Sequence, residues 1–116
     1  MSARGSFADL PPENPYDGVT RRSFDSAGAT VTSYVFDPNA RFPLHRHPEE
    51  QITLVLAGDV ECTADGERTL LRPGDWAVFA PNVEHGMTAG PRGARFLAVV
   101  MPRRSSTGSY TVVEET

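Results

Sequence analysis

Residues 45–51 read HRHPEEQ, and the spacing within this stretch decides how the whole chain is interpreted. Side chains two positions apart point the same way in an extended strand, so His45 and His47 share one face. Residues 48–50 can form a turn, and a new strand begins at Gln51. The turn returns Gln51 to the two imidazoles. The stretch therefore predicts the start of a metal site, with a glutamine where a carboxylate ligand would be expected.

The third and last histidine, His85, follows the apolar run WAVFA (76–80) and a corner at residues 81–83. If the strands are neighbours in a barrel, the three imidazoles converge and Gln51 completes the set. Neutral imidazole is a ligand for Fe, Ni, Zn, Mn and Cu, and such a site keeps open positions for water or substrate. We therefore expect one divalent transition metal ion, with the ligands His45, His47, Gln51 and His85.

From Val19 onward, short apolar runs alternate with turn residues, and β-branched and aromatic residues are enriched in the runs. The runs are ATVTSYVF (29–36), QITLVLAG (51–58), DVECTA (59–64), ERTLLR (67–72), WAVFA (76–80), ARFLAVVM (94–101) and SYTVVEE (109–115). Asp65-Gly66 is the clearest turn, a two-residue hairpin signal. No segment carries a helical stripe. The sequence predicts an all-β sandwich or barrel over residues 19–116, preceded by a flexible or partner-contacting arm, residues 1–18.

Two spaced motifs make the chain resemble the cupins. The first cupin motif, G-x5-H-x-H-x3-4-E-x6-G, is matched by Asn39, His45, His47, Gln51 and Gly58. The second, G-x5-P-x-G-x2-H-x3-N, is matched by Gly74, Asn82 and His85, with Ala80 in the Pro place and Ala89 in the last Asn place. Asn39 and Asn82 stand in glycine places, and Asn is the next-best residue at positive φ. The resemblance implies a single-domain jelly-roll antiparallel β-barrel with a metal centre.

Gln51 occupies the Glu place of the first motif and adds no negative charge, which leaves the charge of the ion available to polarise a substrate oxygen. Small cupins with Gln at this place include enzymes resembling those that linearise unsaturated uronates in pectin breakdown. Such relatives tend to carry an acid in the last barrel strand, ahead of a Pro and an Arg. Here Pro102 and Arg104 are kept, but Ala98 stands where the acid would lie. This departure argues against the uronate activity.

The alternation of side chains along each strand predicts which residues line the inside of the barrel. Tyr34 and Phe36, Phe96 and Val100, and Met87 are expected to point inward, either to line an apolar substrate pocket, which would suit an aromatic or polyketide-like molecule, or to form ordinary core. Arg41 has the parity of His45 and could bind a carboxylate at the pocket mouth, although a surface arginine beside a turn is the favoured alternative. Glu49 and Glu50 are expected to be exposed turn residues.

Three functions remain open. The first is a metal-dependent enzyme that uses Lewis-acid polarisation to cyclise, isomerise or eliminate from a small oxygenated molecule. The second is a metal-dependent dioxygenase of flavonol-like or other enolisable substrates. The third is a non-catalytic cupin that binds or senses a small molecule.

Charge and composition limit the kinds of partner and the location that we expect for this protein. The formal charge of −4 and the scattered arginines argue against nucleic acid. No apolar run reaches the roughly 18 residues of a membrane span, and the N-terminus lacks a signal-peptide core, so the expected location is cytoplasmic. The lone Cys62 is expected to be a small buried hydrophobe. Apolar side chains on both faces of residues 52–56 predict a covered outer face, with the N-terminal arm or a second subunit as the cover, and we expect a homodimer.

Overall fold

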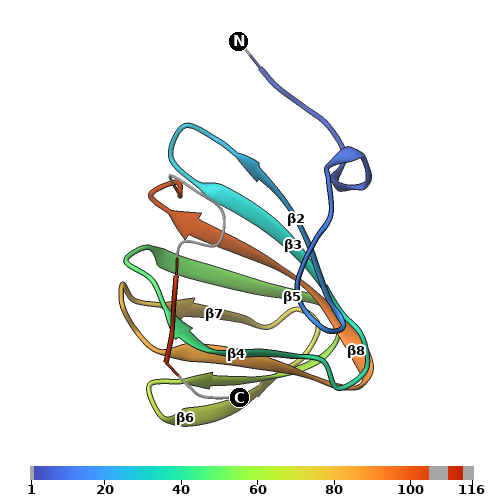
Figure 1. Cartoon of the computed structure of the whole chain (residues 1–116), viewed down its shortest axis with the longest axis vertical. Coiled ribbons are helices and arrows are strands. Elements are labelled where there is room, and N and C mark those ends of the chain that lie inside the picture. The colour runs from blue at the N-terminus through green and yellow to red at the C-terminus, as the bar shows by residue number, and fades with distance from the viewer. Residues whose placement is uncertain (1, 105–109, 114–116) are drawn as a thin grey trace.

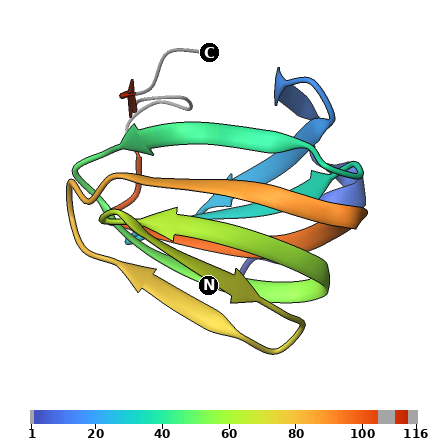
Figure 2. The same cartoon turned by 90° about the horizontal axis from the view of Figure 1, so that it is seen from below.

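The computed structural model describes residues 2–104 and 110–113. Within them, every element is a strand except the 3-10 turn η1 (Phe7–Asp9). The strands are β1 (Glu13–Tyr16), β2 (Val19–Asp25), β3 (Thr30–Phe36), β4 (Arg41–Arg46), β5 (Glu50–Ala64), β6 (Glu67–Leu71), β7 (Trp76–Phe79), β8 (His85–Met101) and β9 (Thr111–Val112). They pair antiparallel and curl into a half-barrel (Figures 1 and 2), which confirms the predicted all-β fold.

The two longest strands, β5 and β8, pair with each other from Glu50↔Met101 to Ala64↔His85. One path of the sheet runs β1-β2-β3-β8-β4-β9, while β5 connects β8 to β6 and β7. The runs 51–58 and 59–64, expected as two strands, are therefore one continuous strand.

The halves of β5 are joined by a bend instead of a turn. The register with β8 shifts between Val55 and Ala57 and again between Gly58 and Val60. Gly58 (φ 69°) and Gly93 (φ 75°) lie in the left-handed region where the two strands cross. A Cβ on Gly58 would overlap the carbonyl oxygen of Gly93, so only glycine permits this approach.

The corners follow the expected turn chemistry. Asn39 (φ 62°) and Asn82 (φ 66°) both adopt positive φ, as their glycine places in the two motifs required. Asp65 (φ 50°) and Gly66 (φ 81°) form the two-residue hairpin between β5 and β6, with Ala64 opposite Glu67. These local predictions are confirmed.

Both ends of the chain take part in the sheet. The segment expected as an arm, residues 1–18, contains β1, which pairs with β2 and is held by an Arg21 Nε–Glu13 Oε1 ion pair of 3.2 Å. At the other end, only β9 of the expected strand 109–115 pairs with β4, and positions 109, 114 and 115 lie outside the described residues.

The concave side of the half-barrel holds the hydrophobic core, whose buried members include Val19, Phe36, Phe42, Val55, Val60, Cys62, Phe79 and Phe96. Burial raises the pKa of the Cys62 thiol to about 11, so this side chain packs as a neutral hydrophobe. Among the described residues, no helix is long and apolar enough to cross a membrane.

Candidate metal centre

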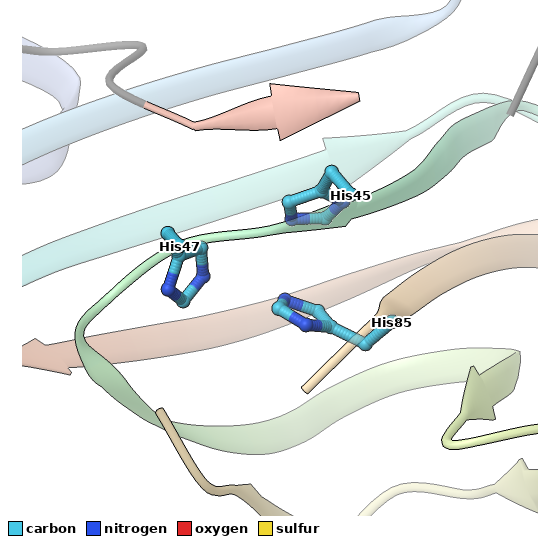
Figure 3. A group of neighbouring side chains, drawn as sticks. All are labelled: His45, His47 and His85. Carbon is cyan, nitrogen blue, oxygen red and sulfur yellow. The ribbon is translucent and has the colours of Figure 1, made fainter. Parts of the chain in front are cut away.

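Strand pairing brings the three histidines together. His45 lies opposite His85 in the β4–β8 pair, and His47 follows directly after β4. The corner at Asn82 fixes the third position, because its N–H donates to the carbonyl of His47 (2.8 Å). Figure 3 shows the three imidazoles pointing toward one another from β4, the turn after it and the start of β8.

The geometry is compact and dry. One ligand nitrogen from each ring lies within 4.8 Å of the others. The ring centroids of His45 and His85 are 4.2 Å apart, and those of His47 and His85 are 4.9 Å apart. All three residues are buried, His85 to 1% exposure. Phe42 packs against His45 and Phe79 stacks on His85, so the rings have little freedom to turn away.

Each imidazole uses its Nδ1 atom for a backbone carbonyl. The partners are Pro43 for His45 (2.8 Å), Glu49 for His47 (3.0 Å) and Val83 for His85 (2.9 Å). A neutral ring that donates from Nδ1 carries its lone pair on Nε2. All three rings are therefore held in the tautomer that presents Nε2 to a common centre, which is how proteins orient histidine ligands of a metal.

Two acceptors face each other at this centre. The amide of Gln51 donates from Nε2 to Thr53 Oγ1 (3.0 Å), which turns its Oε1 toward His47 Nε2 at 3.1 Å. With Nδ1 protonated, His47 Nε2 has only a lone pair to offer Gln51. His85 Nε2 is buried without a hydrogen-bond partner in the described structure. A cation between these atoms would satisfy all of them, so the group fits a metal ion.

The electrostatics keep the rings neutral. Burial, with the neighbouring His85 as the next cause, lowers the pKa of His45 to about 3. Burial also lowers the pKa of His85 to about 4, and burial and then the charge of Arg104 lower that of His47. Three neutral imidazoles and an amide oxygen are a donor set that could hold a divalent transition metal.

Glu49 is placed differently from the expectation of an exposed turn residue. It is buried, with Oε1 3.3 Å from Arg104 Nε and 3.5 Å from His47 Nδ1. Arg104 is equally buried, and its backbone N–H donates to Thr30 Oγ1 (3.0 Å). The expectation was wrong because the partner of Glu49 lies after the last long strand, and local spacing does not reveal it.

Arg41 does not share the inward face of His45. The β4–β8 register shifts between Phe42 and His45, so one extra residue reverses the parity. Phe42 points inward, whereas Arg41 is exposed and borders a shallow outer depression of about 170 Å³ beside Glu61 and Arg68. The bulge left no trace in the hydrophobic pattern.

The other expected wall residues separate into two groups. Val100 lies opposite Gln51 and is next to the metal centre, and Tyr34 contacts Phe42, which packs on His45. The remaining three belong to the core: Phe36 and Phe96 pack in one aromatic cluster, and Met87 is buried opposite Phe42.

Polar residues that parity did not single out line the inner face of the same strands. Ser23 pairs with Thr32, Thr32 with Ala98, and Ala98 with Thr53, so they form one row across β2, β3, β8 and β5. Threonine is common in strands for its branched shape, so these hydroxyls gave no functional signal in the sequence.

Comparison with known proteins agrees with this geometry. The family profile described as Cupin domain matches residues 32–100, more than half of the chain and all three histidines. The chain is similar to the pectin degradation protein KdgF of Dickeya dadantii, with 27% identity over 99 residues that cover 84% of this chain and 90% of that protein.

Two solved structures are also similar. An RmlC-like cupin from Shewanella frigidimarina has a TM-score of 0.80 at 25% identity and covers 90% of this chain and 95% of its own. KdgF from Halomonas sp. has a TM-score of 0.78 at 26% identity, and the match covers 88% of this chain and 97% of that one.

Proposed function

This chain belongs to the Cupin domain family, and from that premise we propose that it is a metal-dependent enzyme acting on a small oxygenated organic molecule. The main support is the convergence of three buried imidazoles whose Nδ1 atoms all face backbone carbonyls. A site whose lone pairs already aim at one point binds a divalent ion with little rearrangement.

The donor set favours Lewis-acid chemistry: isomerisation, cyclisation or elimination. A divalent ion held here would polarise a substrate oxygen, because neither the imidazoles nor Gln51 offsets its charge. The chain's own contribution is to hold these neutral donors in place and to exclude water around them. Glu49, whose carboxylate lies near His47, is paired with Arg104 and faces the Nδ1 side of the ring.

The inner wall supports an oxygen-rich substrate. Arg104 contributes to the lowered pKa of all three histidines, and its charge is paired with that of Glu49. Thr32 and Thr53 flank Ala98 on the inner face of the sheet, so their hydroxyl-bearing side chains lie on this wall. An organic acid with further hydroxyl or carbonyl groups fits this surface better than the aromatic or polyketide-like molecule that parity suggested.

The relatives named for pectin degradation make sugar acids from pectin the first compounds to test. Ala98 stands where the resemblance implies an acid, so any proton transfer has to use a different group. Activity on uronates is therefore one of the reactions covered by the proposal. Other hydroxy and keto acids are tested alongside the uronates.

We also propose that the chain forms a homodimer through the outer face of the sheet. An apolar row runs across five strands there, through Phe24, Val31, Val99, Ile52 and Val78. Leu54 and Trp76 continue it and are exposed, Trp76 to 66%. Phe7 packs on Phe24 at the edge of this face, and a second copy is the occupant that we infer for the rest.

The test begins with metal. Purified protein is dialysed against chelator, reloaded separately with Fe, Ni, Zn, Mn and Cu ions, and analysed for bound metal. Each loaded form is then assayed by mass spectrometry with a panel of sugar acids, hydroxy acids and flavonols, with oxygen uptake recorded in parallel. The matched control is His45→Ala, which keeps the pocket wall and removes one ligand.

We expect about one metal per chain and conversion of an organic acid without oxygen uptake. Metal-dependent oxygen uptake with a flavonol would instead support the dioxygenase alternative. A ligand recovered unchanged from every metal form would support a binding or sensing protein. Failure to retain any metal would overturn the proposal.

A further inference from the structure

The two end strands of the curled sheet meet beside the metal centre. On the path β1-β2-β3-β8-β4-β9, the strands β1 and β9 are at opposite ends. Tyr16 is the last residue of β1, and Tyr110 directly precedes β9. Their hydroxyl oxygens are 3.1 Å apart, a hydrogen bond between residues 94 positions apart in the chain. One phenol–phenol bond thus links the two ends of the sheet.

The rings of this pair lie on the side chains that point into the pocket. The Tyr110 ring packs edge-on to His45 (centroids 5.2 Å apart) and against Phe42 (5.5 Å). The Tyr16 ring packs edge-on to Phe42 at 4.8 Å. Because Phe42 and His45 are inward residues of β4, the two tyrosines cover this side of the metal centre.

The two sides of the contact are anchored unequally. β1 is fixed by its ladder with β2 and by the Arg21–Glu13 ion pair. β9 has two residues, which lie opposite His45 and Arg46, with one further bond from Val113 N to Leu44 O (3.0 Å). So short a strand opens locally far more easily than the core strands. The hydroxyl bond therefore has a large share in keeping Tyr110 in place.

We propose that the Tyr16–Tyr110 pair is a specificity-determining contact: it closes the sheet over His45 and limits the size of molecule that reaches the metal. The inference rests on the proposed function, because it assigns the pair a role at that metal centre. Removing either hydroxyl breaks the same bond, and loss of one neutral hydrogen bond raises the open fraction about five-fold.

The test uses the full chain loaded with Co(II), whose visible absorption reports ligand binding. Stopped-flow rates are measured for two probes of different size, azide and 2,6-pyridinedicarboxylate. The variants are Tyr16→Phe, Tyr110→Phe and the double variant, which keep both rings. Tyr34→Phe is the matched control, since its ring also contacts Phe42 but its hydroxyl is outside the pair.

We expect each single variant to accelerate the bulky probe about five-fold and azide less than two-fold. The double variant should gain no more than either single one, because all three remove the same bond. Equal acceleration of both probes would overturn the proposal and indicate that the pair only positions His45. Additive effects, or unchanged rates, would overturn it as well.

Hydrogen exchange of the metal-free protein separates this inference from the proposed function. The amide of Val113, which donates to the Leu44 carbonyl, should exchange several-fold faster in either Phe variant than in the wild type. Unchanged exchange would contradict the closing role whether or not the protein binds metal. Failure of the wild type to bind Co(II) would contradict both the proposed function and the role of the pair at the metal. If the Phe variants nevertheless exchanged faster, the hydrogen bond would have a structural role only.

Discussion

The two halves of β5, before and after Gly58, differ in which face is apolar. Beyond the bend, Val60 and Cys62 point into the core and Glu61 faces outward, as expected for a sheet with one wet side. Before it, Gln51 and Thr53 are buried inside while Leu54 is exposed outside. At these three positions the usual order is reversed, although Val55 in the same half is a core residue.

The reversal indicates where the protein uses its surface. A buried polar interior is costly unless its groups are paired, so a row of hydroxyls and imidazoles inside a barrel is typical of a ligand site. An exposed apolar exterior is also costly and is typical of a contact with a partner. The first half of β5 thus has residues beside a candidate metal centre on one face and a candidate interface on the other, whereas the second half keeps the ordinary alternation, with Val60 and Cys62 in the core.

The largest expected effect comes from removing the bend between the halves. Gly58→Ala places a Cβ against the carbonyl oxygen of Gly93 and forces a non-glycine residue to positive φ. We expect a loss of roughly 4 kcal/mol or more in the free energy of unfolding, or failure to fold. Chemical denaturation followed by tryptophan fluorescence measures it.

Gly66→Ala is the matched control. Gly66 also has positive φ (81°), but an added Cβ would meet no atom within 4 Å. It should cost only about 1 kcal/mol, the strain of the backbone alone. An equal loss of unfolding free energy in both variants would mean that the close approach of Gly58 to Gly93 does not require glycine at position 58.

The next effect concerns the candidate metal centre. His85→Ala removes the ligand nitrogen that has no other partner in the described structure, so metal affinity should fall at least about 100-fold. Calorimetric titration with Zn(II) measures this loss. Cys62→Ala, in the core half of the same strand pair, should leave the affinity within about two-fold. Comparable losses in both variants would show that metal binding depends on general stability and not on this ligand.

The corners of the fold and the shared face of two histidines could be predicted from the sequence because they depend on local chemistry. Asn39, Asn82 and the Asp65-Gly66 pair adopt positive φ for reasons contained in a few neighbouring residues. The parity of His45 and His47 also survives, because both lie after the bulge in β4. Wherever backbone geometry follows from residue type, the prediction is confirmed.

Contacts between distant segments explain what the sequence could not provide. Glu49 is buried because Arg104 reaches it, and Tyr16 meets Tyr110 only when the sheet has curled. Arg41 lies outside because of one irregular position between Phe42 and His45. Each of these depends on how strands are placed in space, which hydrophobic periodicity does not record.

The pH dependence tests the candidate metal centre, because its three imidazoles are both titratable and buried. In the unfolded chain, histidine has a pKa of about 6.5. In the folded protein, burial lowers the pKa of His45 to about 3 and that of His85 to about 4. Between these values the unfolded state binds more protons, so the free energy of unfolding falls as the pH drops from about 6.5 toward 4.

We expect the metal-free protein to lose on the order of a few kcal/mol over this interval and to be fully stable above it. Urea denaturation at pH 7, 6 and 5 measures the slope. In His45→Gln one of the three buried imidazoles is gone, so the slope should become smaller while His47 and His85 still contribute. The folded imidazoles resist protonation, so bound metal should be retained to about pH 5, below the ordinary pKa of imidazole. A pH-independent free energy of unfolding would contradict neutral burial of the histidines.

The smallest effect on the fold is expected on the outer face of the first half of β5. Leu54 is 38% exposed in the single chain and lies opposite Trp76 in an apolar row. If a second copy covers this face, Leu54→Glu buries an unpaired carboxylate in the interface and shifts the protein toward monomer. In the monomer the same side chain remains in water, so the free energy of unfolding should change by no more than about 0.5 kcal/mol. Light scattering at micromolar concentration measures the mass.

Leu70→Glu is the control on the other side of the bend. Leu70 is more exposed (49%), but it lies opposite Glu61 on the ordinary, polar outer face of the second half. If the reversed half alone forms the interface, Leu54→Glu lowers the mass and Leu70→Glu does not, while both retain full metal binding. A wild-type monomer would remove the dimer proposal. Dissociation by both variants would show that exposed leucines on either half hold the copies together, and that the reversal of β5 does not mark the interface.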